Sequence, residues 1–118
     1  MKDSDLLRLR HITKYCDDIA KSISRYGASF EIFSEDTDYL NSVSMSIMQI
    51  GELSIGLSEE FRSLTREQMA WGFIRGMRNM FAHGYYKMDK SIIWEVATKD
   101  IPILLEFCNK KASEYVQC

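Results

Sequence analysis

An arginine, an amide, an imidazole and a phenol lie within eight residues of this chain. They are Arg78, Asn79, His83 and Tyr85, with Gly84 between the last two. A guanidinium group presents a planar set of donors that matches phosphate oxygens, and histidine exchanges a proton near neutral pH. Together these side chains suit a site that holds a phosphate group and transfers a proton.

The spacing restricts how a helix can present these groups. Asn79 and His83 are four residues apart, so they share one helical face. Arg78 and His83 are five apart, which at about 100° per residue separates them by roughly 140° around the axis. Both reach one pocket only if the last turn loosens, or if the pocket is wide and shared with a second chain. Gly84 fits the position after the helix, where left-handed backbone costs glycine little.

The same residues also have an ordinary structural explanation. Basic side chains are common in the last turn of a helix because they complement its dipole, and a tyrosine after a helix often fills a core edge. Taken alone, the spacing Arg-x-x-x-x-His is a weak pattern. The chemistry therefore needs support from the rest of the chain.

Charge is distributed unevenly along the sequence. The net charge is −2, which argues against broad attraction to nucleic acid. The segment from Arg75 to Lys90 nevertheless contains four basic residues and only one acidic residue, Asp89. Such a confined basic patch suits a site for one or a few phosphates, although charge clusters of this size are also common on solvated faces.

Length and composition predict one domain, over residues 1–118, with 46% hydrophobic residues and a core that needs no disulfide or metal. No apolar run is long enough to span a membrane and the first residues are polar, so we expect a cytoplasmic protein. Cys16, Cys108 and Cys118 are far apart and are expected to be reduced thiols, with Cys118 in a loose tail. We expect no metal or cofactor, because no Glu-x-x-His pair is present.

Helical periodicity runs through the chain. Apolar residues that recur every three or four positions predict long helices at residues 5–26, 37–57, 65–83 and 89–115. A short helical turn or loop is expected at 28–36 and a short helical piece at 58–61, and Asp100 and Pro102 are expected to restart or kink the fourth helix. Because no stretch alternates like a strand, we predict an all-α fold, an antiparallel up-and-down four-helix bundle with short extra helical turns.

Two positions make this prediction more specific. Thr65 followed by Gln68 has the pattern of a capping box, which places the start of the third long helix at Thr65. Gly51 weakens the second helix by up to about 1 kcal/mol, so we expect a neighbouring helix to approach closely there. The residues of the third helix expected to face inward are Met69, Phe73, Met77, Met80 and Phe81.

Large apolar residues are more numerous than one small bundle needs to bury. The chain has seven methionines and two tryptophans. A homodimer is the simplest way to provide an additional interface, although methionine and aromatic stripes are also common in cores.

The segment from Arg78 to Tyr85 resembles the Arg-x-x-x-x-His-x-Tyr signature of HepT-like proteins, a branch of the HEPN superfamily. The resemblance continues outside the signature and covers nearly the whole chain. The further matching pieces are Gln49-Ile50-Gly51-Glu52, Leu57-Ser58-Glu59-Glu60, Trp71 before Gly76-Met77, Ile93-Trp94 and Asp100-Ile101-Pro102.

The resemblance implies a homodimer whose paired signatures line a cleft between subunits. It implies metal-independent cleavage of RNA by the toxin half of a toxin–antitoxin pair, with a minimal nucleotidyltransferase of the MNT type as antitoxin. In this family pattern Arg78 and His83 are the catalytic pair, Asn79 is a supporting polar group and Tyr85 is adenylylated. Tyr86 follows directly and offers a second hydroxyl, but the signature spacing favours Tyr85.

RNA can be cut without a metal when its own 2′-hydroxyl attacks the adjacent phosphorus. We hypothesise that His83 transfers protons and Arg78 holds the phosphoryl group. A second proton-transfer group then comes from Tyr85, from water or from His83 of the other subunit. The alternatives are a non-catalytic helical dimer that binds a nucleotidyltransferase partner or a nucleotide, and a purely structural helical adaptor.

Overall fold

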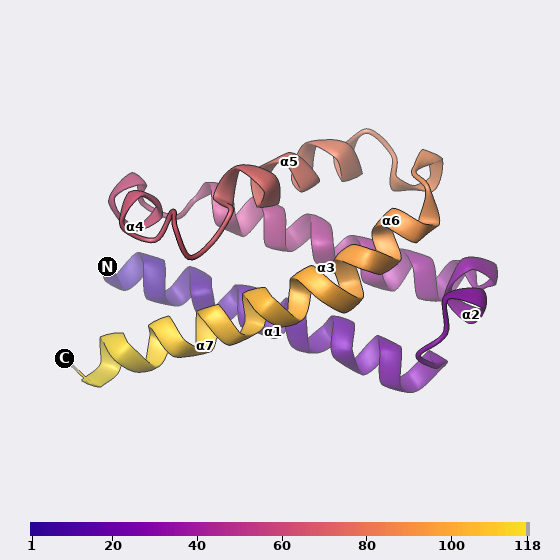
Figure 1. Cartoon of the computed structure of the whole chain (residues 1–118), viewed down its shortest axis with the longest axis horizontal. Coiled ribbons are helices and arrows are strands. Elements are labelled where there is room, and N and C mark those ends of the chain that lie inside the picture. The colour runs from indigo at the N-terminus through magenta and orange to yellow at the C-terminus, as the bar shows by residue number, and fades with distance from the viewer. Residues whose placement is uncertain (118) are drawn as a thin grey trace.

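The computed structural model describes residues 1–117, and this part of the chain is helical without strands (Figure 1). The four longest helices are α1 (Asp3–Tyr26), α3 (Thr37–Ile55), α5 (Trp71–Ala82) and α7 (Ile101–Gln117). The shorter segments are α2 (Phe30–Glu35), α4 (Glu59–Leu64), η1 (Tyr85–Lys87), α6 (Lys90–Glu95) and η2 (Val96–Asp100). The predicted all-α class is confirmed.

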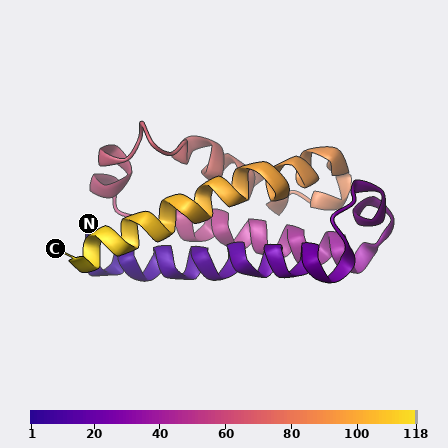
Figure 2. The same cartoon turned by 60° about the horizontal axis from the view of Figure 1, so that its bottom comes forward.

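Helix α3 lies at the centre of the packing that matters for the signature. It packs along α1 on one side and along α5 on the other, while α7 covers α1. Consecutive long helices run in opposite directions (Figure 1). Figure 2 shows α7 crossing above α1 and α3 at an angle rather than lying parallel to them. The signature at the end of α5 is therefore supported mainly by α3.

The core is formed by the predicted apolar faces. Leu9 and Ile12 of α1 and Val43, Ile47 and Ile50 of α3 are fully buried. Since buried apolar area is the main source of folding free energy, these faces fix how the two helices pack. Within residues 1–117, none of the helices has the length and apolar content that crossing a bilayer requires.

Two of the three cysteines lie in this core. Cys16 and Cys108 are free thiols, 1% and 0% exposed. Burial raises the pKa of Cys16 to about 12 and raises the pKa of Cys108 as well, so neither is a thiolate at neutral pH. The prediction of reduced thiols is confirmed for both, whereas Cys118 lies outside the described residues.

The predicted start of the third long helix was wrong. Thr65 follows α4 as its C-terminal cap, and α5 begins only at Trp71. The Thr65 hydroxyl donates to the Phe61 carbonyl at 2.8 Å and accepts from Trp71 Nε1 at 2.9 Å. These two hydrogen bonds occupy the hydroxyl that the capping box would have used.

The predicted inner face of this helix was only partly right. Met69, Met77 and Phe81 are buried, but Phe73 and Met80 are 48% and 46% exposed. At helical spacing both exposed residues point to the side of α5 roughly opposite Arg78, which packs against α3. The later start of α5 does not explain the exposure of Phe73 and Met80. The segment has more apolar residues at helical spacing than the buried face of α5 accommodates.

The helix cap predicted after the signature is present. Asp89 precedes α6, and its carboxylate accepts from the backbone N–H of Ser91 at 2.9 Å. Helix α6 continues through the π-helical η2 into α7, where Pro102 is the second residue. Because proline has no N–H to continue the helical ladder, the wider π turn before it absorbs the interruption.

Candidate active site

Arg78 sits at a close contact between α3 and α5. A Cβ atom added to Gly51 of α3 would lie 2.6 Å from the Arg78 Cβ atom and 3.1 Å from its Cα atom. Only glycine leaves room for α5 at this distance, since real Cβ contacts are longer. The close approach predicted at Gly51 is confirmed, and it fixes the base of the arginine side chain against α3.

The guanidinium group of Arg78 is held from two sides. Its Nε donates to Glu52 Oε1 at 2.5 Å, and its Nη1 donates to Asn79 Oδ1 at 3.1 Å. The side chain is 39% exposed. An arginine has five N–H donors, so three remain for an anion that approaches from solvent. The structure thus brings Arg78 and Asn79 together and adds Glu52 to them.

His83 lies at the end of the same helix. It is the residue at which α5 stops, and its backbone N–H donates to the Asn79 carbonyl at 3.3 Å. Gly84 follows with φ of +111°, which confirms the predicted glycine stop. The His83 side chain is exposed, and within residues 1–117 no hydrogen bond joins its imidazole to Arg78, Asn79 or Tyr85.

Tyr85 ties the turn after α5 back to α3. Its hydroxyl donates to Asn41 Oδ1 at 2.8 Å, and its ring is partly buried against the core. Tyr86 is 70% exposed and lies beside the Lys87 ammonium, which is 5.8 Å from its ring centre. The two neighbouring tyrosines therefore differ, because only the hydroxyl of Tyr85 is held by α3.

One line of side chains on α3 includes the two that hydrogen-bond to the signature. It contains, at alternating steps of four and three, Asn41, Met45, Met48, Glu52 and Ile55. This spacing places them on one helical face. Sequence reasoning assigned no role to Asn41 or Glu52. Glu52 stood in a recognised piece of the family pattern, but no local signal marks Asn41, which meets its partner 44 residues away.

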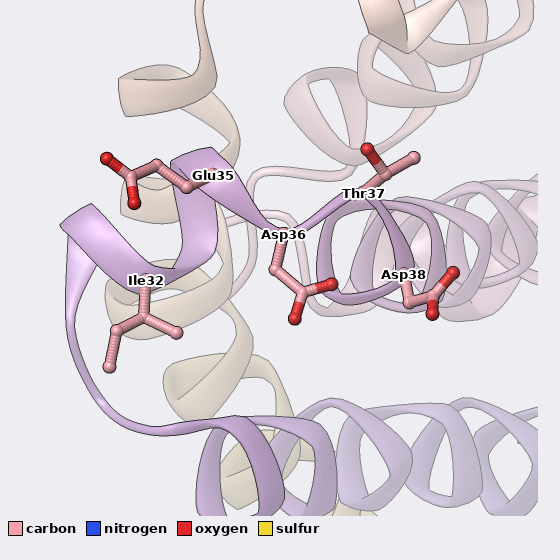
Figure 3. A pocket seen from close by; sticks show the side chains of 5 residues that line it. All are labelled: Ile32, Glu35, Asp36, Thr37 and Asp38. Atoms are coloured by element: carbon pink, nitrogen blue, oxygen red, sulfur yellow. The ribbon is translucent and has the colours of Figure 1, made fainter.

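A hollow lies at the turn between α2 and α3, and Figure 3 shows the side chains that line it. They include three carboxylates, from Glu35, Asp36 and Asp38. Asp36 Oδ1 accepts from the Tyr39 backbone N–H at 3.1 Å, so this residue caps α3. Three carboxylates repel a phosphate, and the hollow therefore does not extend the cationic site.

Comparison with known proteins shows which family the chain resembles over most of its length. The family described as Ribonuclease HepT-like matches residues 12–110. The protein named "Putative RNase TTE0752" from Caldanaerobacter subterraneus subsp. tengcongensis is 33% identical over 92% of this chain and 91% of its own length. "Probable ribonuclease HepT" from Thermococcus cleftensis is 30% identical over 76% of this chain and 86% of its own length. No solved structure matches the chain.

Proposed function

The chain belongs to the Ribonuclease HepT-like family, and we propose that it is a metal-independent endoribonuclease that acts as the toxin of a toxin–antitoxin pair. The observation that carries this proposal is the anchored arginine. Arg78 is held by Glu52 and Asn79 with donors left over, at the solvent-facing end of the helix that His83 terminates. The same activity is supported by relatives that are named as ribonucleases and that align with this chain over most of their own length.

The proposed reaction uses the RNA itself as nucleophile. The 2′-oxygen attacks the adjacent phosphorus and loses its proton, the bond from phosphorus to the 5′-oxygen breaks, and that oxygen takes up a proton. The products are a 2′,3′-cyclic phosphate and a 5′-hydroxyl. Arg78 stabilises the charge on the phosphoryl oxygens, and His83 transfers a proton at one of the two oxygens.

The second proton-transfer group is best supplied by a partner subunit. Within the described chain His83 makes no hydrogen bond to Arg78, and the signature opens to solvent along the face of α3. Met45 is 50% exposed on that face. We propose that two copies of this four-helix domain pair across it, so that His83 of each copy serves a shared cleft. Tyr85 and water are the other sources of the proton.

The proposed antitoxin is a nucleotidyltransferase of the MNT type that adenylylates Tyr85. A phosphate and a base on this hydroxyl would displace its hydrogen bond to Asn41 and compete with RNA for Arg78. Mass spectrometry after coexpression with a nucleotidyltransferase of the MNT type should place the added mass on Tyr85. An adduct on Tyr86, or no adduct, would contradict this part of the proposal.

Cleavage of RNA in the presence of a chelator tests the activity. The wild-type protein should cut RNA, and His83→Ala or Arg78→Ala should lower the rate by about 10² or more, as removal of a proton-transfer group or charge stabiliser does. His11→Ala is the matched control, because His11 is the other histidine of the chain and is exposed on α1. RNA that is bound but not cut would instead favour a non-catalytic binding protein.

A further inference from the structure

A basic hollow of about 520 Å³ lies at the junction of α4 and α5, apart from the signature. Three arginines line it: Arg62 from α4, Arg66 from the following turn and Arg75 from α5. Trp71 and Gly72 form part of its wall, and Glu59 is its one carboxylate. The sequence patch from Arg75 to Lys90 included only one of these arginines, because the other two precede α5.

The three arginines keep their capacity to bind an anion. Among the described residues no carboxylate lies within ion-pair distance of Arg62, Arg66 or Arg75, since the ion pairs of the chain involve other residues. The Nε atom of Arg62 is buried and has no hydrogen-bond partner within residues 1–117. Three guanidinium groups against Glu59 give the hollow a net positive charge, which suits phosphate oxygens.

Helix α5 connects this hollow to the signature. Gly72, Arg75, Asn79 and His83 follow one another at steps of three and four, so they share one face of the helix. The distance along the axis from Gly72 to His83 is about 16 Å at 1.5 Å per residue. A single RNA strand of a few nucleotides spans this distance.

The surface between the two sites leaves room for a strand. No side chain or backbone of another segment lies within 4 Å of a Cβ atom built on Gly72 or on Gly76. A polymer with several phosphates can contact the hollow and the signature together, whereas free phosphate or a mononucleotide reaches only one of them. Alignment of the two sites therefore favours an RNA strand over a small anion.

We propose that the hollow of Arg62, Arg66 and Arg75 is an auxiliary subsite for the RNA backbone, several nucleotides from the bond that is cut. This inference rests on the proposed ribonuclease function. The subsite binds phosphates through charge and hydrogen bonding and reads no base. It makes the enzyme prefer RNA long enough to reach from the signature to α4.

Binding of labelled single-stranded RNA of twelve nucleotides tests this subsite. The double variant Arg66→Gln/Arg75→Gln, made in the His83→Ala background to prevent cleavage, should weaken binding about tenfold or more. The slope of log K against log salt should fall by roughly 0.7 for each phosphate that the variant no longer neutralises. Adding Arg62→Gln extends the series, and the double variant stands alone if the triple variant unfolds. Arg10→Gln/Arg25→Gln, two exposed arginines of α1, is the matched control and should bind like the parent.

Cleavage of a dinucleotide separates the subsite from the catalytic residues. With His83 intact, Arg66→Gln/Arg75→Gln should lower kcat/KM about tenfold for the twelve-nucleotide RNA and by less than twofold for a dinucleotide. Unchanged binding and cleavage of the long RNA, or equal losses for both lengths, would overturn the inference. Loss of nucleotidyltransferase binding with normal RNA binding would also overturn it. Arginine-dependent RNA binding by a wild-type protein that cuts neither RNA would uphold the subsite and refute the proposed activity.

Discussion

The ion pair between Glu52 and Arg78 contributes little to folding but fixes a geometry. Both side chains are about half exposed, at 48% and 39%, and exposed ion pairs contribute about 0 to 1 kcal/mol. The pair orients the guanidinium group through Nε and leaves the Nη2 donors to an incoming anion. We infer that Glu52 positions Arg78 and does not itself contact the RNA.

Loss of Glu52 should therefore affect turnover more than stability. Glu52→Ala is expected to lower kcat about tenfold or more, because a misplaced charge stabiliser loses much of its effect, while the melting temperature changes by only a few degrees. Glu52→Gln retains an acceptor for Nε and should keep most of the activity. Rates of RNA cleavage and thermal unfolding of both variants provide the check. An alanine variant with wild-type kcat would show that Arg78 needs no such support.

Tyr85 and Asn41 offer a second measurement at the scale of single residues. Their hydrogen bond of 2.8 Å should contribute about 1 kcal/mol to the free energy of unfolding. Tyr85→Phe and Asn41→Ala should each destabilise by that amount in urea, and the double variant should lose hardly more than either. Tyr86→Phe is the control and should leave stability unchanged. Additive losses would mean that the two side chains act independently.

Sequence spacing reveals the residues that act locally and misses those that act across the fold. Arg78, His83 and Tyr85 form a pattern within eight positions, so the sequence alone is enough to propose them as a site. Glu52 and Asn41 meet their partners 26 and 44 residues away. A polar residue on an exposed helical face has no sequence feature that tells such a partner from an ordinary solvated side chain.

At the scale of helices, the contact between α3 and α5 links packing to the signature. Gly51→Ala would place a methyl group 2.6 Å from the Arg78 Cβ atom, so α5 must move. Overpacking of this kind costs about 1 to 3 kcal/mol, and the shift should also displace Arg78 and lower RNA cleavage. Urea unfolding and cleavage rates measure the two effects. A stable and fully active variant would show that the helices separate without consequence for the site.

Gly76→Ala is the matched control on α5. A Cβ atom there meets nothing within 4 Å, and alanine is the better helix former by about 1 kcal/mol. This variant should be slightly more stable than wild type in the same urea titration. If Gly51→Ala lowers the free energy of unfolding and Gly76→Ala raises it, the loss at Gly51 comes from close packing and not from a change in helix propensity.

Helix existence was predictable here, while one helix boundary was not. Apolar periodicity located α1 and α3, and the caps at Asp89 and Gly84 were right because each depends on neighbouring residues. Thr65 failed because two elements compete for its hydroxyl. Its hydrogen bonds with Phe61 and Trp71 depend on how α4 folds against α5, and no local pattern contains that information.

At the scale of the whole molecule, Asp5 joins the start of the chain to the start of α4. It is 1% exposed, and its carboxylate accepts from the Ser58 backbone N–H and hydroxyl, both at 2.7 Å. Burial by itself raises the pKa of Asp5, but hydrogen bonds from Ser58 and Lys2 and the nearby N-terminal charge outweigh it. The net result lowers the pKa below the usual 3.8.

This direction fixes the pH dependence. A lowered pKa in the folded state means that ionised Asp5 stabilises the fold above the unfolded pKa, and that the stabilisation is lost as the pH falls through the folded pKa. Asp5→Asn should cost about 2 kcal/mol at pH 7, because hydrogen bonds to a charged acceptor are replaced by weaker ones. The difference in free energy of unfolding between this variant and the wild type should shrink below about pH 4. Urea unfolding at pH 7 and at pH 3 measures it. A gap that is independent of pH would mean that the charge of Asp5 is unimportant.

The proposed dimer is the property of the whole molecule on which the activity depends most. Met45 lies on α3 between Asn41 and Glu52 and is 50% exposed, so a partner that covers the signature must also cover Met45. In a twofold interface each substitution appears twice, and Met45→Glu therefore places two carboxylates in one apolar contact. We expect this variant to sediment as a monomer with unchanged helical circular dichroism and to lose RNA cleavage.

Ile103→Glu is the control for this prediction. At a position of α7 that is 61% exposed, it should remain dimeric and active. A monomeric Met45→Glu protein that still cuts RNA at the wild-type rate would mean that one chain contains the complete site, and a fully active dimer would place the interface on another face.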